Sequence, residues 1–174
     1  MQEKTTENPI TGTSIYLLVA AIVSILALVS PAAAADRLVP FNGSLHAQEA
    51  ISAGATPATF VADGSGGGIA TLIGRFTLTW KFTVTIADGT GTGPVRFTAA
   101  NGDEIFTTAA GISWPADTPG VFHIQEIQTV TGGTGRFAGA RGTFVVERLT
   151  DLNTGLTSGS FHGTITSPAS ANRE

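Results

Sequence analysis

The chain contains no cysteine among its 174 residues, which excludes disulfide bonds, thiol catalysis and thiolate metal sites. Charged residues are also few, at 13% of the total, and the formal net charge is −4. No basic run occurs, so the sequence lacks the electrostatic footprint of a nucleic-acid-binding protein. A domain of this size without disulfide bonds has to be stabilised by side-chain packing and hydrogen bonds alone.

Motifs for several classes of chemistry are absent as well. No Gly-x-Ser-x-Gly elbow and no Gly-Lys-Ser/Thr phosphate loop occurs. The three histidines, His46, His123 and His162, have no second histidine two or four positions away. Metal sites usually show such local ligand pairs, so the sequence predicts neither a metal nor a cofactor.

The longest hydrophobic run lies at the N-terminus. Residues 15–29 carry no charge, and Ala33-x-Ala35 then fits a signal-peptidase site with cleavage before Asp36. We therefore expect residues 1–35 to form a hydrophobic signal helix that is removed on export. The alternative is an uncleaved helix that anchors the chain in a membrane, although the run is shorter than a typical span of about 20 residues.

The remainder has the length of one domain, which we place at residues 36–166, followed by a flexible tail at 167–174. The expected location is secreted, periplasmic or in the cell envelope. Membrane contact is expected only through the N-terminal segment.

Residues 76–86 show the clearest pattern, because apolar residues alternate there with threonine and lysine. Period two is typical of a strand with one covered face. Further strands are predicted at 42–51, 69–74, 95–100, 104–110, 121–130, 142–149 and 157–166, with loops that include 63–68 and 88–94. Eight such strands with short connections predict an all-β domain that closes into an eight-stranded antiparallel β-barrel, since closure removes exposed edges. A two-sheet sandwich is the alternative.

The glycine-rich run at residues 132–142 has two interpretations. Gly133-x-Gly135-x-x-Ala138 fits a dinucleotide fingerprint, but the continuation is β-branched and aromatic rather than helical. A tight turn between two strands is therefore favoured. In that turn Gly132, Gly133 and Gly135 allow positive φ, Phe137 folds back as a plug on the barrel's end, and Gly139 and Gly142 leave room for it or for a neighbouring strand.

The same run, taken as Gly-Gly-Thr-Gly-x-Phe-x-x-Ala-Arg-Gly, resembles the glycine turn of plant dirigent proteins and is similar to that of allene oxide cyclases. Residues 69–77 are also similar to an Ala-Thr-x-x-Gly-x-Phe-Thr run in exported bacterial proteins that share the turn. The resemblance implies an eight-stranded barrel of calycin type and association into dimers or trimers. It carries no catalytic residue to this chain, and the pocket cysteine of the plant cyclase has no counterpart.

Three polar residues are candidates for catalysis. Glu126 shares a pleat face with Phe122 and Ile124. If that face is inward, the carboxyl is buried, and burial of an unpaired carboxyl raises its pKa, as a general acid in a cofactor-free isomerase or cyclase requires. If the face is outward, Glu126 lies in water. A weaker form of the argument applies to Glu49, and His123 is the third candidate.

The aromatic residues can line a ligand cavity or fill the barrel, since eight strands enclose just enough space for either. The ligand-binding candidates are Phe76, Trp80, Phe82, Phe122 and Phe144. The sequence thus favours an exported barrel that binds a small apolar ligand. The alternatives are a cofactor-free isomerase or cyclase of allene oxide cyclase or dirigent type, and a structural or self-associating envelope protein without activity.

Overall fold

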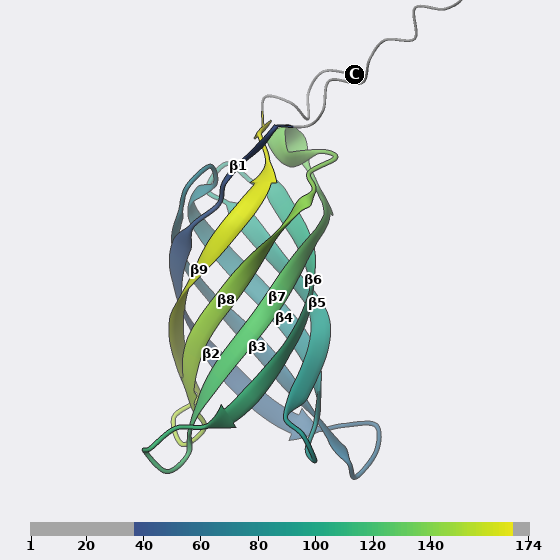
Figure 1. The fold of residues 1–174 in the computed structure, drawn as a ribbon, viewed down its shortest axis with the longest axis vertical. Helices are drawn as coiled ribbons and strands as arrows, with labels where there is room; N and C mark the ends of the chain where they lie inside the picture. Colours follow the sequence, from purple (N-terminus) through teal and green to yellow (C-terminus); the bar gives the residue numbers. More distant parts are fainter. Residues whose placement is uncertain (1–36, 169–174) are drawn as a thin grey trace, which may run out of the picture. The chain divides into compact units, whose positions relative to one another are not determined.

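A computed structural model describes residues 37–168 of the chain, and within them eight antiparallel strands close into a barrel (Figure 1). The predicted signal helix and cleavage site, and nearly all of the predicted tail, lie outside the described residues. The strands are β1 (Leu38–Pro40), β2 (Gly43–Ala53), β3 (Thr59–Ala70), β4 (Gly74–Thr85), β5 (Thr90–Ala99), β6 (Glu104–Pro115), β7 (Val121–Gly133), β8 (Gly142–Asp151) and β9 (Leu156–Thr166).

The ring closes because β9 pairs with β8 on one side and with β2 on the other. Every remaining neighbour in the ring is also the neighbour in sequence, from β2 through to β9. The short strand β1 pairs with the last residues of β9, past the part of β9 that pairs with β2. It is therefore not counted among the eight strands of the ring. The predicted antiparallel barrel is confirmed, and the sandwich alternative is wrong.

The alternating pattern of β4 has the predicted consequence. Phe76, Leu78, Trp80 and Phe82 are buried, and the threonines and Lys81 between them are exposed. One face of each strand therefore looks into the barrel, and the other contacts water.

The prediction for residues 63–68 was wrong, because this glycine-rich segment is the middle of β3 and not a loop. The predicted strand at 69–74 is wrong as well, because β3 ends at Ala70, residues 71–73 form a turn and β4 begins at Gly74. Gly64 pairs directly with Trp80 of β4, and a Cβ on Gly64 would overlap the indole ring. Glycine thus serves here to admit a large aromatic side chain from the neighbouring strand, which is a known role of glycine within strands.

The predicted turn at residues 88–94 is mostly strand as well. Only the first part is a turn, and β5 pairs with β6 from Thr90 onward. Pairing with both neighbours in the ring overrides the local turn propensity of a glycine- and proline-containing segment.

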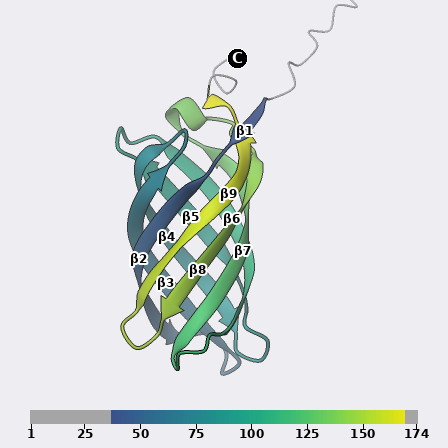
Figure 2. The same ribbon diagram turned by 60° about the vertical axis from the view of Figure 1, so that its left-hand side comes forward.

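The glycine turn at 132–142 lies at the β1 end of the barrel, where Figure 2 shows a short helical turn above the strands. That turn, η1 (Gly135–Phe137), has three residues and leads into strand β8, which is not the helix that a dinucleotide site requires. Phe137 is fully buried and belongs to the hydrophobic core cluster. Positive φ occurs at Gly132, Gly135, Gly139 and Gly142 but not at Gly133, where a Cβ would instead collide with backbone.

An aromatic core fills this half of the barrel. Its rings pack at centroid distances of 5.1–6.4 Å, and its members are Phe41, Phe76, Phe97, Phe144 and Phe161, with Ile73, Ile105, Ile165 and Phe137 packed around them. Among residues 37–168, no helix has the length and apolar character needed to cross a membrane.

Candidate functional site

The inward side chains change character along the barrel axis. On β7 they run from Val130 in the core, through Gln128 and Glu126, to Ile124 and Phe122 near the opposite end. The strands β2 and β4 repeat this order, with an apolar core, then Glu49 or Trp80, then apolar residues near the hairpin turns. On β8 the apolar core is followed by Arg148 and Thr150. The barrel interior therefore consists of the aromatic core, a buried polar layer and a cavity.

The polar layer is one connected set of hydrogen-bonded side chains. We define it by its eight members, which are Glu49, Trp80, Thr107, Glu126, Gln128, Arg148, Thr150 and Thr157. They come from β2, β4, β6, β7, β8 and β9, so the layer links strands from around the whole ring.

Arg148 lies at the centre of this layer. Its Nε and Nη2 donate to Oε1 of Glu126 at 3.1 and 2.9 Å, and its Nη1 donates to Oε2 of Glu49 at 3.1 Å. Nη1 also contacts the hydroxyls of Thr150 and Thr157, at 2.7 and 3.0 Å. The guanidinium carbon lies 5.1 Å from the centre of the Trp80 ring. The one positive charge is thus engaged by two carboxylates, two hydroxyls and an aromatic face.

The remaining members hold the two carboxylates in place. Gln128 donates from Nε2 to Oε2 of Glu126 at 3.1 Å, and Thr107 donates to Oε1 of Gln128 at 2.6 Å. The indole nitrogen of Trp80 donates to Oε2 of Glu49 at 3.1 Å. Buried charges persist only when they are paired and hydrogen-bonded, because each loses its hydration. Two carboxylates against one guanidinium leave the layer with a formal charge of −1.

A cavity of about 470 Å³ lies beyond the polar layer, at the end of the barrel away from β1. Its volume falls within the roughly 300–1,000 Å³ typical of small-molecule sites. Glu49, Glu126, Arg148 and Thr150 border it on the side of the polar layer. Most of its wall is apolar, and the larger members of that wall are Ile51, Phe60, Phe82, Val84, Ile86, Ile112, Phe122, Ile124 and Leu152.

The mouth of the cavity is formed by hairpin turns with bulky apolar side chains. Ile51, Ile86, Ile112 and Leu152 line the cavity and are each about half exposed. Asp88 also lines it, and hydrogen bonds from the backbone N–H and the hydroxyl of Thr90 lower the pKa of this exposed carboxyl. An apolar molecule entering here meets apolar surface before it reaches the polar layer.

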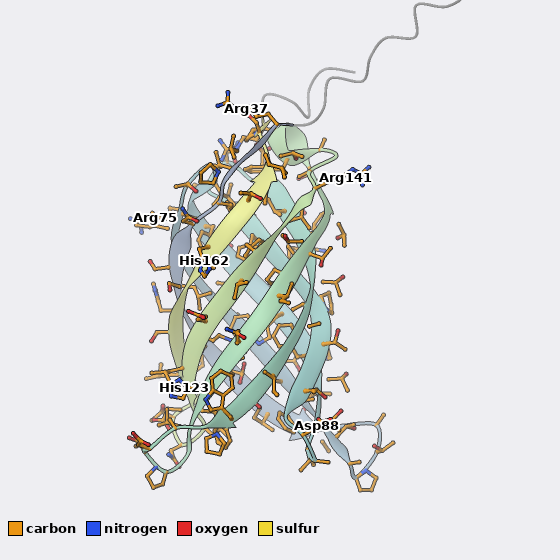
Figure 3. The ribbon with its side chains drawn as sticks, in the orientation of Figure 1. Arg37, Arg75, Asp88, His123, Arg141 and His162 are labelled. Carbon is orange, nitrogen blue, oxygen red and sulfur yellow. The ribbon has the colours of Figure 1, made fainter. Side chains whose placement is uncertain are left out.

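The structure brings two of the three catalytic candidates together. Glu49 and Glu126 are both buried and both bind Arg148, so of the two alternatives left open by the sequence, their strand faces are the inward ones. His123 lies on the outer face of β7, where its ring stacks on Trp114 with centroids 5.5 Å apart (Figure 3). It therefore does not share the interior with the two carboxylates.

The aromatic candidates separate into three places. Phe82 and Phe122 line the cavity, Trp80 belongs to the polar layer, and Phe76 and Phe144 belong to the aromatic core. The barrel is thus neither fully open nor fully filled. Sequence periodicity alone could not distinguish these levels, because it tells which face a residue is on but not its depth along the axis.

Arg148 is the central residue that sequence reasoning missed. The signal was present, because Phe144, Val146 and Arg148 occupy alternate positions on one strand and so share a face. From the sequence, a buried Glu126 is expected to be unpaired. The structure supplies the missing partner from the adjacent strand.

Within residues 37–168, no three His, Asp or Glu side chains are arranged to hold a metal ion. Fold and site together define this protein as an eight-stranded antiparallel β-barrel with an apolar cavity over a buried ionic layer.

Comparison with protein-family models, with curated proteins and with solved structures finds no match to the chain.

Proposed function

We propose that the barrel binds a small, largely apolar molecule in the cavity between the polar layer and the hairpin turns. The observation that carries the proposal is a cavity of about 470 Å³ whose walls are apolar except at its inner end. A few polar groups in an otherwise apolar pocket are the usual arrangement for fixing the orientation of a ligand. The closed ring of strands supports it, because a rigid wall binds without a large ordering cost.

The test uses two neighbouring alanines on β6. Ala109 is buried and lines the cavity, whereas Ala110 is exposed on the outer face. Leucine at position 109 would occupy cavity volume, and leucine at position 110 would extend into solvent. The neutral dye phenylnaphthylamine, titrated into the protein, reports binding by its fluorescence, and decanol serves as the competitor.

We expect Ala109→Leu to weaken dye and decanol binding by about tenfold or more, equivalent to about 1.4 kcal/mol. Ala110→Leu is expected to bind as the unmodified protein does. Circular dichroism and thermal unfolding confirm that both variants are folded. Equal affinity in both variants, or no saturable binding by the unmodified protein, contradicts the proposal.

A second candidate function is a cofactor-free isomerase or cyclase, as the resemblance to allene oxide cyclases and dirigent proteins implies. The observation that favours it is that Glu49 and Glu126 both border the apolar cavity, where a carboxyl can act on a bound substrate. Turnover of an allene oxide is measured with the unmodified protein and with Glu126→Gln. Activity that is unaffected by this substitution removes Glu126 as the acid.

We further propose that the protein is exported after cleavage before Asp36. We also propose that it belongs to the calycin-like group of barrels that includes dirigent proteins and allene oxide cyclases. Mass spectrometry of the protein from its native host gives the mature N-terminus, and an intact N-terminus favours the anchored alternative. Light scattering of the processed domain tests the dimer or trimer that the resemblance implies. Self-association without ligand binding would favour the structural alternative.

A further inference from the structure

We propose that the ligand of this cavity carries a hydrogen-bond-donating cationic head group, a primary ammonium on an apolar body, and that Oε1 of Glu49 receives it. The inference rests on the proposed function, because it assigns the head group of the same ligand. It follows from which polar atoms of the buried layer are already engaged and which are left to face the cavity.

Glu49 is the carboxylate with an oxygen to spare. Its Oε2 accepts from both Trp80 and Arg148, while its Oε1 accepts no hydrogen bond from any residue of the described part of the chain. The side chain is 4% exposed, and Glu49 borders the cavity. Glu126 differs, because both of its oxygens already accept hydrogen bonds. Among residues 37–168, the buried side-chain nitrogen or oxygen without a hydrogen-bond partner is Nε of Arg136, so Oε1 of Glu49 is not sealed off and a donor in the cavity can reach it. A hydrogen bond to this charged oxygen contributes more than one between neutral groups.

The charge around the cavity favours the same head group. Glu49, Glu126 and Asp88 line it, and Arg148 is the only basic residue among its lining residues. The guanidinium of Arg148 is already held by both carboxylates and two hydroxyls. A carboxylate or phosphate on the ligand would therefore meet net negative charge and no uncompensated cation. An ammonium would instead bring the layer from −1 to neutral.

The loops at the mouth of the cavity also carry negative charge and no positive charge. The turns at residues 54–58, 86–89, 116–120 and 152–155 contain Asp88 and Asp117 and no lysine or arginine. Figure 3 shows Arg37, Arg75 and Arg141 toward the other end of the barrel. An approaching cation is thus attracted at the mouth, although exposed charges are screened by salt and act mainly on the rate of entry.

The experiment compares three probes of equal chain length at neutral pH, which are decylamine, decanol and decanoate. Trp80 donates to Glu49, so its fluorescence reports on the proposed contact. Trp114 is the second tryptophan of the chain and lies at the surface. A Trp114→Phe background therefore isolates the signal of Trp80, and calorimetry provides an independent affinity.

We expect decylamine to bind at least about tenfold more tightly than decanol, and decanoate to bind least, because a hydrogen bond to a buried charge is stronger than one between neutral groups. Two variants locate the contact. Glu49→Gln and Glu126→Gln each remove one negative charge from the polar layer, but only the first removes the unengaged carboxylate oxygen. The preference for decylamine over decanol is expected to disappear in Glu49→Gln, and in Glu126→Gln to decrease with the lost charge but to persist.

The outcomes separate this inference from the proposed function. If decanol or decanoate binds as tightly as decylamine, the head-group assignment is overturned while apolar binding stands. If none of the three probes binds, both proposals fail. Equal loss of preference in the two variants overturns the role of Oε1 of Glu49. Should either variant fail to fold by near-ultraviolet circular dichroism, the ranking of the three probes on the unmodified protein still decides the head group.

Discussion

Arg148 on β8 and Glu49 on β2 form an ion pair across the barrel interior, with Nη1 3.1 Å from Oε2, although 99 residues separate them in the chain. Strand β9 lies between their two strands in the ring. The pair exists only when the barrel is closed. It therefore joins the closure of the fold to the construction of the inner end of the cavity.

The first prediction concerns this ion pair. Arg148→Met keeps a similar apolar stem but leaves Glu49 and Glu126 buried without their cation. We expect the free energy of unfolding to fall by about 3–5 kcal/mol, because an uncompensated buried charge is strongly destabilising. Denaturant unfolding of the residue 36–174 chain measures the change.

Lys81→Met is the matched control. Lys81 pairs with Asp63 on the outer face, with Nζ 3.5 Å from Oδ2 and side chains that are 68% and 47% exposed. Surface pairs contribute at most about 1 kcal/mol. If Arg148→Met costs no more than Lys81→Met, the polar layer does not depend on charge pairing.

The second prediction concerns the plug. Phe137 is fully buried in the aromatic half of the barrel, whereas Phe106 lies on the outer face beneath Arg96. Phe137→Ala is expected to lower the free energy of unfolding by about 3–5 kcal/mol, as for other large-to-small core substitutions. Phe106→Ala should cost about 1 kcal/mol, the contribution of an exposed cation–π contact. Equal costs would show that Phe137 is not part of the core.

The third prediction concerns the glycine-rich strand. Gly64→Ala would place a methyl group against the Trp80 ring, so we expect a loss of about 1–3 kcal/mol through overpacking. Trp80 fluorescence should shift as well. Ser65→Ala changes the exposed residue next to it and should stay within about 0.5 kcal/mol. A neutral Gly64→Ala would contradict the close approach of these two strands.

The fourth prediction concerns acid. Hydrogen bonds from Thr90 lower the pKa of Asp88, and hydrogen bonds from Asn153 and Thr154 lower the pKa of Asp151, both from the ordinary value of 3.8. A carboxyl whose pKa is lower in the folded state stabilises the fold above its unfolded-state pKa. That contribution is lost as the pH falls through the folded-state pKa.

Stability is therefore expected to decline as the pH drops below about 4. The double variant Asp88→Asn with Asp151→Asn should decline less steeply, because asparagine keeps the turn geometry but does not titrate. Urea unfolding at a series of pH values measures both slopes. Parallel slopes for the two proteins would exclude these turns as a source of the acid sensitivity.

Period-two alternation was sufficient to predict the architecture. Residues 76–86 show it almost without interruption, and the structure has β4 there with its apolar face inward. The same reasoning placed Glu126 and Glu49 on inward faces if their apolar neighbours were inward, and both are buried. Local sequence contains these facts because the side-chain period of a strand is two.

Other features depend on residues that are distant in the chain. Residues 63–68 are a strand because they pair with β2 on one side and β4 on the other, and Gly64 leaves the space that the ring of Trp80 occupies. The partner of Glu126 and Glu49 is Arg148, and its role emerges only when β2, β7 and β8 surround one lumen. The sequence by itself determined that the chain forms antiparallel strands with one largely apolar face, and it favoured their closure into a barrel. Only the tertiary structure decided how deep along the barrel axis each inward side chain lies, because that depth depends on strand register and tilt rather than on alternation. This depth in turn decides which half of the barrel is filled, where the charges pair and where the cavity lies.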